Sequence, residues 1–218
     1  ETDIRIADEI LCKGHWEFQD TMEIMAVYEK HYSNRIGTML DLGCNIGSCT
    51  LPLAQRYPDN KIMAFDCQLR AVVCLRQTAE LNHLNNVTAH YSAVSDHCET
   101  RVYNTIDYDW GANFGAYEFE KPYANSDFNG KTTDQTDTIN VVTVDSLNLD
   151  DLVFMKLDIE GMELKALQGA IETILCYRPF ITFEHHKTDR RAAEDLLTKL
   201  DYRVLHNTVG QMTLAVPN

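Results

Sequence analysis

An apolar segment in the second half of the chain runs directly into ionisable residues. In VFMKLDIEGMEL, residues 153–164, the apolar run leads to Lys156, Asp158 and Glu160. Asp158 and Glu160 are two residues apart, so a continued extended backbone turns both side chains to the same side. Lys156 is expected to pair with a neighbouring carboxylate, because burying a lone ammonium group is costly. The two carboxylates could take a proton from an attacking hydroxyl group or bind a divalent metal ion.

These acids also have a structural interpretation. Asp158 could cap the helix expected after it, and Glu160 with Glu163 could favour the first turn of that helix through the helix dipole. A capping role explains one acid but leaves the second acid and Lys156 unexplained. We therefore favour a chemical role.

A second group of ionisable residues, Glu184, His185 and His186, follows the apolar run 180–183. A histidine has a pKa near neutrality and can accept a hydroxyl proton, but neighbouring residues in a strand point to opposite sides, so one of the two histidines should face away. Carboxylate oxygens are also the ligands that Mg²⁺ and Mn²⁺ prefer. Spacing alone does not choose between a proton acceptor and a metal site. The predicted catalytic residues are Asp158, Glu160, Glu184 and His185, and the metal alternative uses Asp158, Glu160 and Glu184.

A glycine-containing segment near the start of the chain predicts a nucleoside site. In DLGCNIG, Gly43 and Gly47 allow a tight turn and a close approach to a ligand, because neither has a Cβ atom. Asn45 stands where a dinucleotide fingerprint has its central glycine, which argues against an NAD-dependent oxidoreductase, and Asp41 would repel phosphate but attract an ammonium group. Asp66, in AFDC, lies about 20 residues further on, where a carboxylate can accept hydrogen bonds from both ribose hydroxyls. The predicted ligand is a positively charged nucleoside without phosphates, S-adenosylmethionine.

The elements that must position these residues alternate along the chain. Apolar runs separated by helical patterns predict a parallel sheet covered by helices on both faces. Two short strands joined through Gly210 predict a C-terminal antiparallel hairpin, so the expected fold is α/β, a seven-stranded, mostly parallel sheet with one reversed strand. The expected strands before the hairpin include 39–42, 62–65, 87–94, 152–157 and 180–183, and the expected helices are 17–32, 48–56, 69–83, 163–176 and 190–200.

Residues 100–140 interrupt this alternation and predict an inserted lid. Two strand-like pieces, TRVYNTI and TINVVTV, flank a long aperiodic loop that is rich in aromatic, Asn and Asp residues. Aromatic faces beside polar side chains suit a polyhydroxylated ring, although half of the aromatic residues could simply pack the lid against the sheet. The aromatic residues are Tyr108, Trp110, Phe114, Tyr117, Phe119, Tyr123 and Phe128, and the polar ones include Asn113, Asn125 and Asp127.

Several successive motifs resemble those of one known family. DLGCNIG, AFDC, LNHLNNV with YSAVSD, VTVDSL, KLDIEGMELKALQGA and RPFITFEHH follow one another between residues 38 and 186 and are similar to the motifs of the FkbM family of S-adenosylmethionine-dependent methyltransferases. The resemblance implies a Rossmann-like class I methyltransferase fold and O-methylation of a small molecule or saccharide. Two departures are Asp66-Cys67, where the family usually has Glu-Pro, and Cys44, where Ala is common.

The resemblance also implies which residues bind the cofactor. Glu17 falls where related enzymes place an acid near the amino and carboxyl groups of the methionine part, but it could equally be a first-turn glutamate of a helix. Ala93 and Val94 could equally be core residues. The implied cofactor residues are Glu17, Asp41, Gly43, Asn45 and Gly47 around the methionine part, Asp66 at the ribose, Gln68 at the edge of the adenosine site, and Ser92, Ala93 and Val94 at the adenine.

Composition sets the outer limits of the interpretation. The 218 residues predict a single methyltransferase domain, 1–218, with an N-terminal helical segment at 1–35. Seven cysteines without paired spacing indicate reduced thiols in a cytoplasmic protein, and no run is long and apolar enough for membrane insertion. A net charge of −14 disfavours a nucleic-acid partner. Because the chain begins at Glu1 rather than methionine, we expect a domain excised from a longer polypeptide.

The functional prediction is therefore an O-methyltransferase for a saccharide hydroxyl, with a deoxy sugar of a glycan, which has an apolar methyl edge, as one candidate acceptor. Two alternatives remain open. One is methylation of a non-sugar small molecule such as a polyketide. The other is a cofactor-binding module without catalysis. The sequence does not define the oligomeric state.

Overall fold

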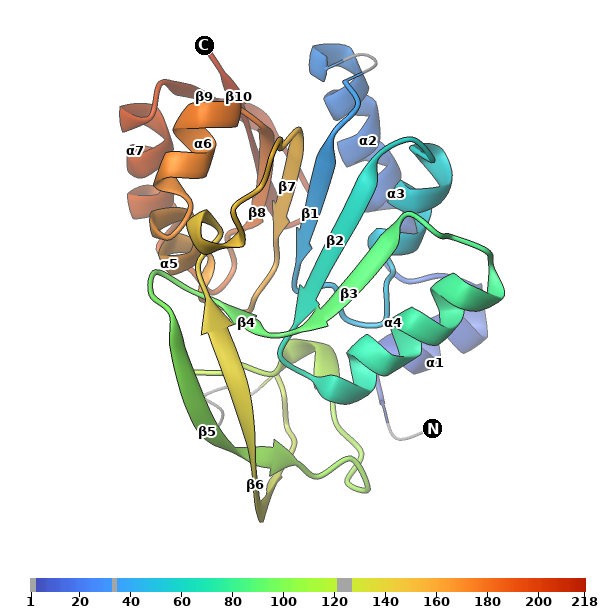
Figure 1. Ribbon diagram of the computed structural model, residues 1–218. Coiled ribbons are helices and arrows are strands. Elements are labelled where there is room, and N and C mark those ends of the chain that lie inside the picture. Colours follow the sequence, from blue (N-terminus) through green and yellow to red (C-terminus); the bar gives the residue numbers. More distant parts are fainter. Residues whose placement is uncertain (1–2, 33–34, 121–126) are drawn as a thin grey trace.

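A seven-stranded sheet forms the centre of the protein (Figure 1). The computed structural model describes residues 3–32, 35–120 and 127–218. The strand order is β3-β2-β1-β7-β8-β10-β9, and every neighbouring pair is parallel except the two pairs that include β10. This topology confirms the predicted mostly parallel sheet with its C-terminal hairpin. The strands are β1 (Thr38–Leu42), β2 (Lys61–Asp66), β3 (Val87–Tyr91), β7 (Phe154–Leu157), β8 (Phe180–Glu184), β9 (Tyr202–Val209) and β10 (Met212–Pro217).

Helices cover both faces of the sheet (Figure 1). Apolar side chains of α2, α3 and α4 pack on one face, and those of α5, α6 and α7 pack on the other. A parallel sheet needs this double cover because its strands are apolar on both faces. The short helix α1 precedes α2. The helices are α1 (Ile6–Lys13), α2 (Phe18–Tyr32), α3 (Thr50–Arg56), α4 (Leu69–Leu81), α5 (Glu163–Gln168), α6 (Ile171–Tyr177) and α7 (Arg190–Lys199).

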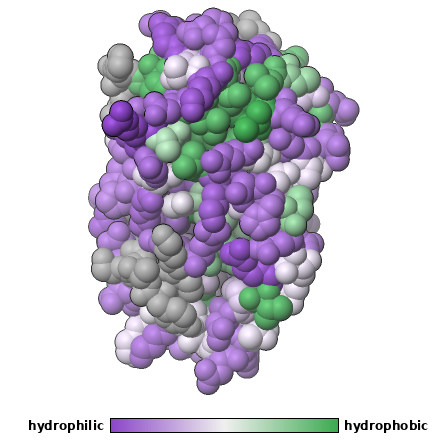
Figure 2. All heavy atoms as spheres, turned by 90° about the vertical axis from the view of Figure 1, so that its left-hand side faces the viewer, coloured by the Kyte–Doolittle hydropathy of each residue, from purple (hydrophilic) through white to green (hydrophobic). Residues whose placement is uncertain are grey.

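The surface over α5, α6 and α7 is mostly hydrophilic, with apolar side chains gathered in the upper part of this face (Figure 2). None of the helices in the described residues is both long enough and apolar enough to cross a membrane.

Two predicted elements are divided in the structure. The helix predicted at 163–176 is interrupted at Gly169, where a Cβ atom would lie only 2.2 Å from the carbonyl oxygen of Ser95. The strand predicted at 87–94 ends at Tyr91. The next strand, β4 (Ala93–Val94), belongs to a second, smaller sheet. Both interruptions come from contacts with distant parts of the chain.

The second sheet contains three strands in the order β4-β6-β5. β5 (Glu99–Ile106) and β6 (Thr132–Val142) pair antiparallel and extend beyond the carboxyl ends of the main strands (Figure 1). We call residues 99–142 the arm. A short 3₁₀-helix, η1 (Phe114–Ala116), lies in the loop between its strands, and a cluster that includes Phe114, Tyr117, Phe119 and Phe128 packs this loop against the arm sheet.

Candidate active site

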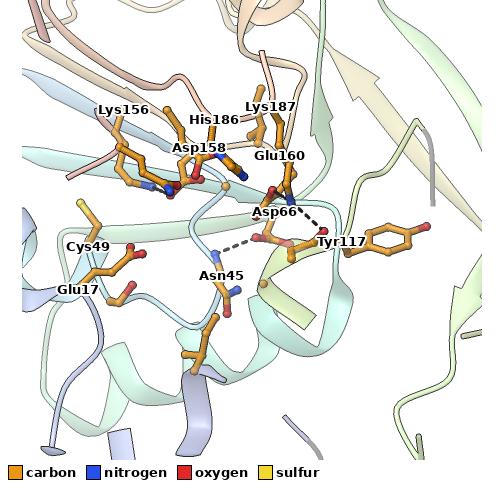
Figure 3. A pocket seen from close by; sticks show the side chains of 18 of the residues that line it. Glu17, Asn45, Cys49, Asp66, Tyr117, Lys156, Asp158, Glu160, His186 and Lys187 are labelled. Atoms are coloured by element: carbon orange, nitrogen blue, oxygen red, sulfur yellow. Dashed lines mark hydrogen bonds and ion pairs between the residues drawn. The ribbon is translucent and has the colours of Figure 1, made fainter. Parts of the chain in front are cut away.

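A cavity of about 840 Å³ lies at the carboxyl ends of β1, β2, β7 and β8 (Figure 3). The N-terminal segment, the arm and the β9–β10 turn complete its walls. Ligands of open α/β sheets bind at this edge of the sheet. Most of the predicted site residues line the cavity, namely Glu17, Gly43, Asn45, Asp66, Gln68, Ser92, Ala93, Val94, Asp158, Glu160 and Glu184.

Asp66 occupies the β2 end of the cavity. Its Oδ2 accepts a hydrogen bond of 2.8 Å from the backbone N–H of Asn45 (Figure 3). Its Oδ1 accepts one of 2.8 Å from the backbone N–H of Gln68. Burial nevertheless raises the pKa of Asp66 to about 6. A carboxylate has about four acceptor positions, so Asp66 can accept two further hydrogen bonds from a diol.

The loop after β1 touches the loop after β7 through the backbone. Gly43 has φ +82°, and a Cβ atom there would lie 1.7 Å from the carbonyl oxygen of Asp158. Only glycine allows this approach. Gly47 has φ +101° and packs against Leu75, so it shapes the loop without lining the cavity.

Asp41 also lies behind the cavity wall, which corrects the predicted direct contact with a ligand. It is 0% exposed, and its Oδ2 accepts a hydrogen bond of 2.6 Å from the hydroxyl of Thr50. Its Oδ1 lies 3.3 Å from Nζ of Lys156, and the same Nζ lies 3.1 Å from Oδ2 of Asp158. Burial alone would lower the pKa of Lys156. The negative charges of Asp158 and Asp41 together have a larger effect and hold this pKa well above its usual value. The predicted pairing of Lys156 with carboxylates is confirmed.

The segment after β7 turns rather than continuing as a strand. Glu160 has φ +54° and Gly161 has φ +96°, so the assumption of a continued extended backbone is wrong, although Asp158 and Glu160 both line the cavity. Glu163, which is 0% exposed, accepts backbone hydrogen bonds from Ile159 at 2.8 Å and from Gly161 at 3.1 Å. Glu163 therefore stabilises the turn, and Asp158 does not cap α5, whose N-cap residue makes no side-chain hydrogen bond.

Glu160 pairs with Lys187, a residue that our prediction did not include. Lys187 also donates a hydrogen bond of 3.4 Å to the carbonyl oxygen of Ala116 in the arm. Burial raises the pKa of Glu160 to about 7, while Lys187 opposes this shift. The sequence does contain a signal for Lys187, because it directly follows the Glu184-His185-His186 cluster.

Glu184 ends β8 on the cavity wall. Its Oε2 is buried and has no hydrogen-bond partner among the described residues. Burial, followed by the charges of Asp158 and Glu160, raises the pKa of Glu184 to about 9. Its carboxyl group is therefore protonated at neutral pH.

The two histidines after Glu184 point in different directions, as strand alternation predicts. Nδ1 of His185 lies 3.0 Å from the hydroxyl of Thr213, and His185 does not line the cavity. His186 does line it, with Nε2 3.8 Å from Oδ2 of Asp127. The geometry thus corrects our choice of His185 and places His186 at the site.

Glu17 lies on the cavity wall before α2, which begins at Phe18. Its φ is +48°, and its carbonyl oxygen accepts a hydrogen bond from the backbone N–H of Thr21. It is thus not a residue of the first helical turn. Burial, then the charge of Asp158, raises the pKa of Glu17 to about 7, although part of its surface stays open to solvent.

Gln68 joins the arm to the β2 side of the cavity. Its Nε2 donates a hydrogen bond of 2.7 Å to the carbonyl oxygen of Phe114, and its Oε1 accepts one of 3.1 Å from the hydroxyl of Tyr108. Gln68 therefore positions the arm as well as lining the site.

The aromatic residues of the predicted lid have different roles. Tyr117 and Phe119 reach the cavity wall while remaining largely buried, and Phe114 and Phe128 are buried in the arm. Trp110 is 47% exposed outside the cavity. Tyr123 and Asn125 lie outside the described residues. Cavity residues that the sequence did not predict come mainly from the N-terminal segment and the β9–β10 turn, namely Ile4, Arg5, Trp16 and Gln211.

The predicted metal set does not form a metal site. Across the described ranges, no three His, Cys, Asp or Glu side chains are arranged to hold a metal ion. Lys156 pairs with Asp158 and Lys187 pairs with Glu160, so these carboxylates already have positive partners. The arrangement fits proton transfer better than metal binding.

Comparisons with known proteins agree with this fold. A family model described as methyltransferase FkbM domain matches residues 28–204. An FkbM methyltransferase structure from Methylobacillus flagellatus KT has a TM-score of 0.53 and 19% identity, covering 87% of this chain and 47% of that chain. Magnesium protoporphyrin IX methyltransferase from Synechocystis PCC 6803, solved with bound S-adenosylmethionine, has a TM-score of 0.55 and 12% identity, covering 100% of this chain and 86% of that chain.

A local sequence match extends the comparison. Over 60 residues, 28% of this chain, the sequence is 37% identical to the tRNA/tmRNA (uracil-C(5))-methyltransferase of Idiomarina loihiensis. The match covers 16% of that relative. The chain thus spans less than two thirds of the FkbM structure and only a small part of this curated relative.

Proposed function

The chain belongs to the FkbM family of S-adenosylmethionine-dependent methyltransferases, and from this premise we propose that it methylates a hydroxyl group of a saccharide. The family assignment confirms the resemblance found in the sequence. The identity of the acceptor and the roles of the individual residues are our proposal.

The cavity has the groups that S-adenosylmethionine requires. Asp66 keeps acceptor positions for the ribose hydroxyls, and Gly43 lets the methionine part approach the backbone. We assign the adenine to the wall that contains Ser92, Ala93 and Val94. We assign Glu17 to the ammonium group of the methionine part. When bound, the cofactor supplies an electrophilic methyl group on a sulfonium.

We assign Asp158 as the group that accepts the proton of the acceptor hydroxyl. It borders the cavity where its carbonyl oxygen meets Gly43, and its carboxylate pairs with the buried ammonium of Lys156. Glu160 is engaged by Lys187, and Glu184 is already protonated at neutral pH. Asp158 is the carboxylate whose backbone touches Gly43, where we place the methionine part of the cofactor, and Lys156 positions it.

The observation that carries the saccharide proposal is the composition of the cavity wall. Tyr117 and Phe119 contribute aromatic surface, while Asn113 and Gln211 contribute amides that both donate and accept hydrogen bonds. A sugar ring has apolar faces and a rim of hydroxyl groups, so it matches such a mixed wall.

The test is incubation with labelled S-adenosylmethionine and a panel of saccharides and non-sugar alcohols, with and without EDTA. We expect a methylated saccharide and turnover that survives EDTA, because Asp158 and Glu160 are each paired with a lysine. Asp158→Asn should lower kcat by about 10²–10⁴-fold, the usual contribution of general base catalysis, with little change in cofactor binding. Asp134→Asn, at an exposed arm position outside the cavity, is the matched control.

Three results would contradict parts of the proposal. Turnover of non-sugar alcohols alone would refute the saccharide assignment and favour a small molecule such as a polyketide. Cofactor binding without turnover of any acceptor would favour a non-catalytic module. Unchanged turnover in Asp158→Asn would instead refute Asp158 as the base.

A further inference from the structure

The methionine part of S-adenosylmethionine carries a carboxylate that the residues assigned so far do not match. Its ammonium group is assigned to Glu17, but its α-carboxylate would enter a cavity on whose wall carboxylate side chains outnumber cationic ones. Like charges brought together in a binding site cost several kcal/mol. The α-carboxylate therefore needs a cationic or hydrogen-bond-donating group on the wall.

The backbone of the loop after β1 does not supply that group. The five consecutive N–H groups of residues 43–47 each donate to an oxygen atom of the protein itself, at 2.7–3.0 Å. The acceptors are the carbonyl oxygens of Phe65 and Cys44 and the side chains of Asp66 and Asn45. Because these N–H groups are already engaged, a side chain is the better source of a donor for a ligand carboxylate.

Two of the three lysine and arginine side chains on the cavity wall already have carboxylate partners. Lys156 lies 3.1 Å from Asp158, and Lys187 pairs with Glu160. Arg5 is the third, and among the described residues no carboxylate forms an ion pair with its guanidinium group. Arg5 therefore has a positive charge that is available to an anionic group of a ligand.

Arg5 lies on the same wall as Glu17. Its guanidinium carbon is 5.5 Å from the ring centroid of Trp16, the residue directly before Glu17. The segment that carries it is held to the arm, because the N–H of Ile4 donates a hydrogen bond of 3.1 Å to the carbonyl oxygen of Ala112. These contacts place an exposed arginine at the edge of the cavity, near the residue assigned to the ammonium group.

Resting on the cofactor placement of the proposed function, we propose that Arg5 binds the α-carboxylate of S-adenosylmethionine while Glu17 binds its ammonium group. A guanidinium group presents a planar fork of N–H donors that matches the two oxygens of a carboxylate. The ring of Trp16 stacks against this group and limits the side-chain freedom that binding would otherwise remove. The two residues together recognise both charges of the amino-acid part, so they distinguish the methyl donor from nucleosides that lack this part.

The experiment is calorimetric titration at about pH 8, where Glu17, with a pKa of about 7, is mostly ionised. The ligands are S-adenosylmethionine, its decarboxylated analogue, which keeps the ammonium group, and its deaminated analogue, which keeps the carboxylate. The variants are Arg5→Met, Arg5→Lys and Glu17→Gln. Arg191→Met, at an exposed position of α7 outside the cavity, is the matched control. No acceptor is present, so the result does not depend on which acceptor the enzyme uses.

We expect Arg5→Met to weaken the binding of S-adenosylmethionine about tenfold, a difference of about 1.4 kcal/mol, because it removes a charge-assisted hydrogen-bond donor. The same variant should bind the decarboxylated analogue as the wild type does. Arg5→Lys should recover part of the loss, since it keeps the charge but not the fork. Glu17→Gln should weaken the binding of the two ligands that carry the ammonium group and leave the deaminated analogue unchanged.

Three outcomes would overturn the role of Arg5. They are unchanged affinity of Arg5→Met for S-adenosylmethionine, an equal loss for all three ligands, which would mean that Arg5 only shapes the wall, and a defect confined to KM for anionic acceptors. Glu17→Gln without effect would refute the ammonium assignment of the proposed function, while the comparison of the carboxylate-containing ligands still decides the role of Arg5. A wild type that binds none of the three ligands would refute both.

Discussion

Lys156→Met removes the only positive charge in contact with the buried carboxylate of Asp41 among the described residues. Nζ of Lys156 lies 3.3 Å from Asp41 and 3.1 Å from Asp158, and at an effective dielectric constant of about 20 each contact corresponds to about 5 kcal/mol of attraction. Removing the ammonium group also removes its own desolvation cost, which is several kcal/mol. We therefore expect a net loss of about 3–5 kcal/mol in the free energy of unfolding, the usual result of stranding one partner of a buried pair.

The assay is urea unfolding followed by circular dichroism, with two further variants. In Asp41→Asn/Lys156→Met the stranded charge is gone, so this double variant should be more stable than Lys156→Met alone. Lys13→Met is the exposed control, because the Lys13 side chain is 60% exposed and its pair with Glu9 should contribute less than about 1 kcal/mol. A loss below about 1 kcal/mol in Lys156→Met, or a double variant less stable than the single one, would refute this account of the buried pair.

Three shorter predictions concern the cavity. Asp66→Ala should weaken S-adenosylmethionine binding about 10–100-fold in a calorimetric titration, because hydrogen bonds to a charged group contribute about 1.5–3 kcal/mol, and unchanged affinity would argue against its ribose role. Gly43→Ala should lower the free energy of unfolding in urea by about 3 kcal/mol or more, since its Cβ atom would lie 1.7 Å from the carbonyl oxygen of Asp158, and wild-type stability would contradict the described contact. The pKa of Glu184 is about 9 in the folded protein against an ordinary value of 4.5, so folding binds a proton and this contribution to stability is lost as the pH rises through about 9. Glu184→Gln should therefore lose less stability than the wild type in unfolding experiments between pH 6 and about 9, and identical pH profiles would count against the raised pKa.

The succession of strands and helices, and the loops that follow β1 and β2, were predictable because their signals are local. Asp66 follows an apolar strand, and Gly43 belongs to a turn that begins directly after β1. The division of 87–94 at Ser92 was not predictable from apolar periodicity, because the residues after Ser92 remain apolar and their partner, β6, lies more than 40 residues away. The break at Gly169 likewise depends on a tertiary contact with Ser95.

The β7 and β8 side of the cavity was less predictable. β8 is buried on both faces along most of its length, so its residue pattern could not show which of His185 and His186 faces the cavity. The spacing of Asp158 and Glu160 suggested a continued extended backbone, but Glu160 has a positive φ, so the chain turns there. The pairing of Glu160 with Lys187 joins two loops separated by 27 residues, and local spacing carries no information about it.

The backbone contact between Gly43 and Asp158 has a kinetic consequence. A segment that touches its neighbour without an intervening side chain has little freedom to move alone, so the loops after β1 and β7 should change position together. Occupation of the nucleoside side would then set the position of the proposed base before an acceptor arrives. We expect ordered substrate addition, with the methyl donor binding first and the demethylated donor leaving last.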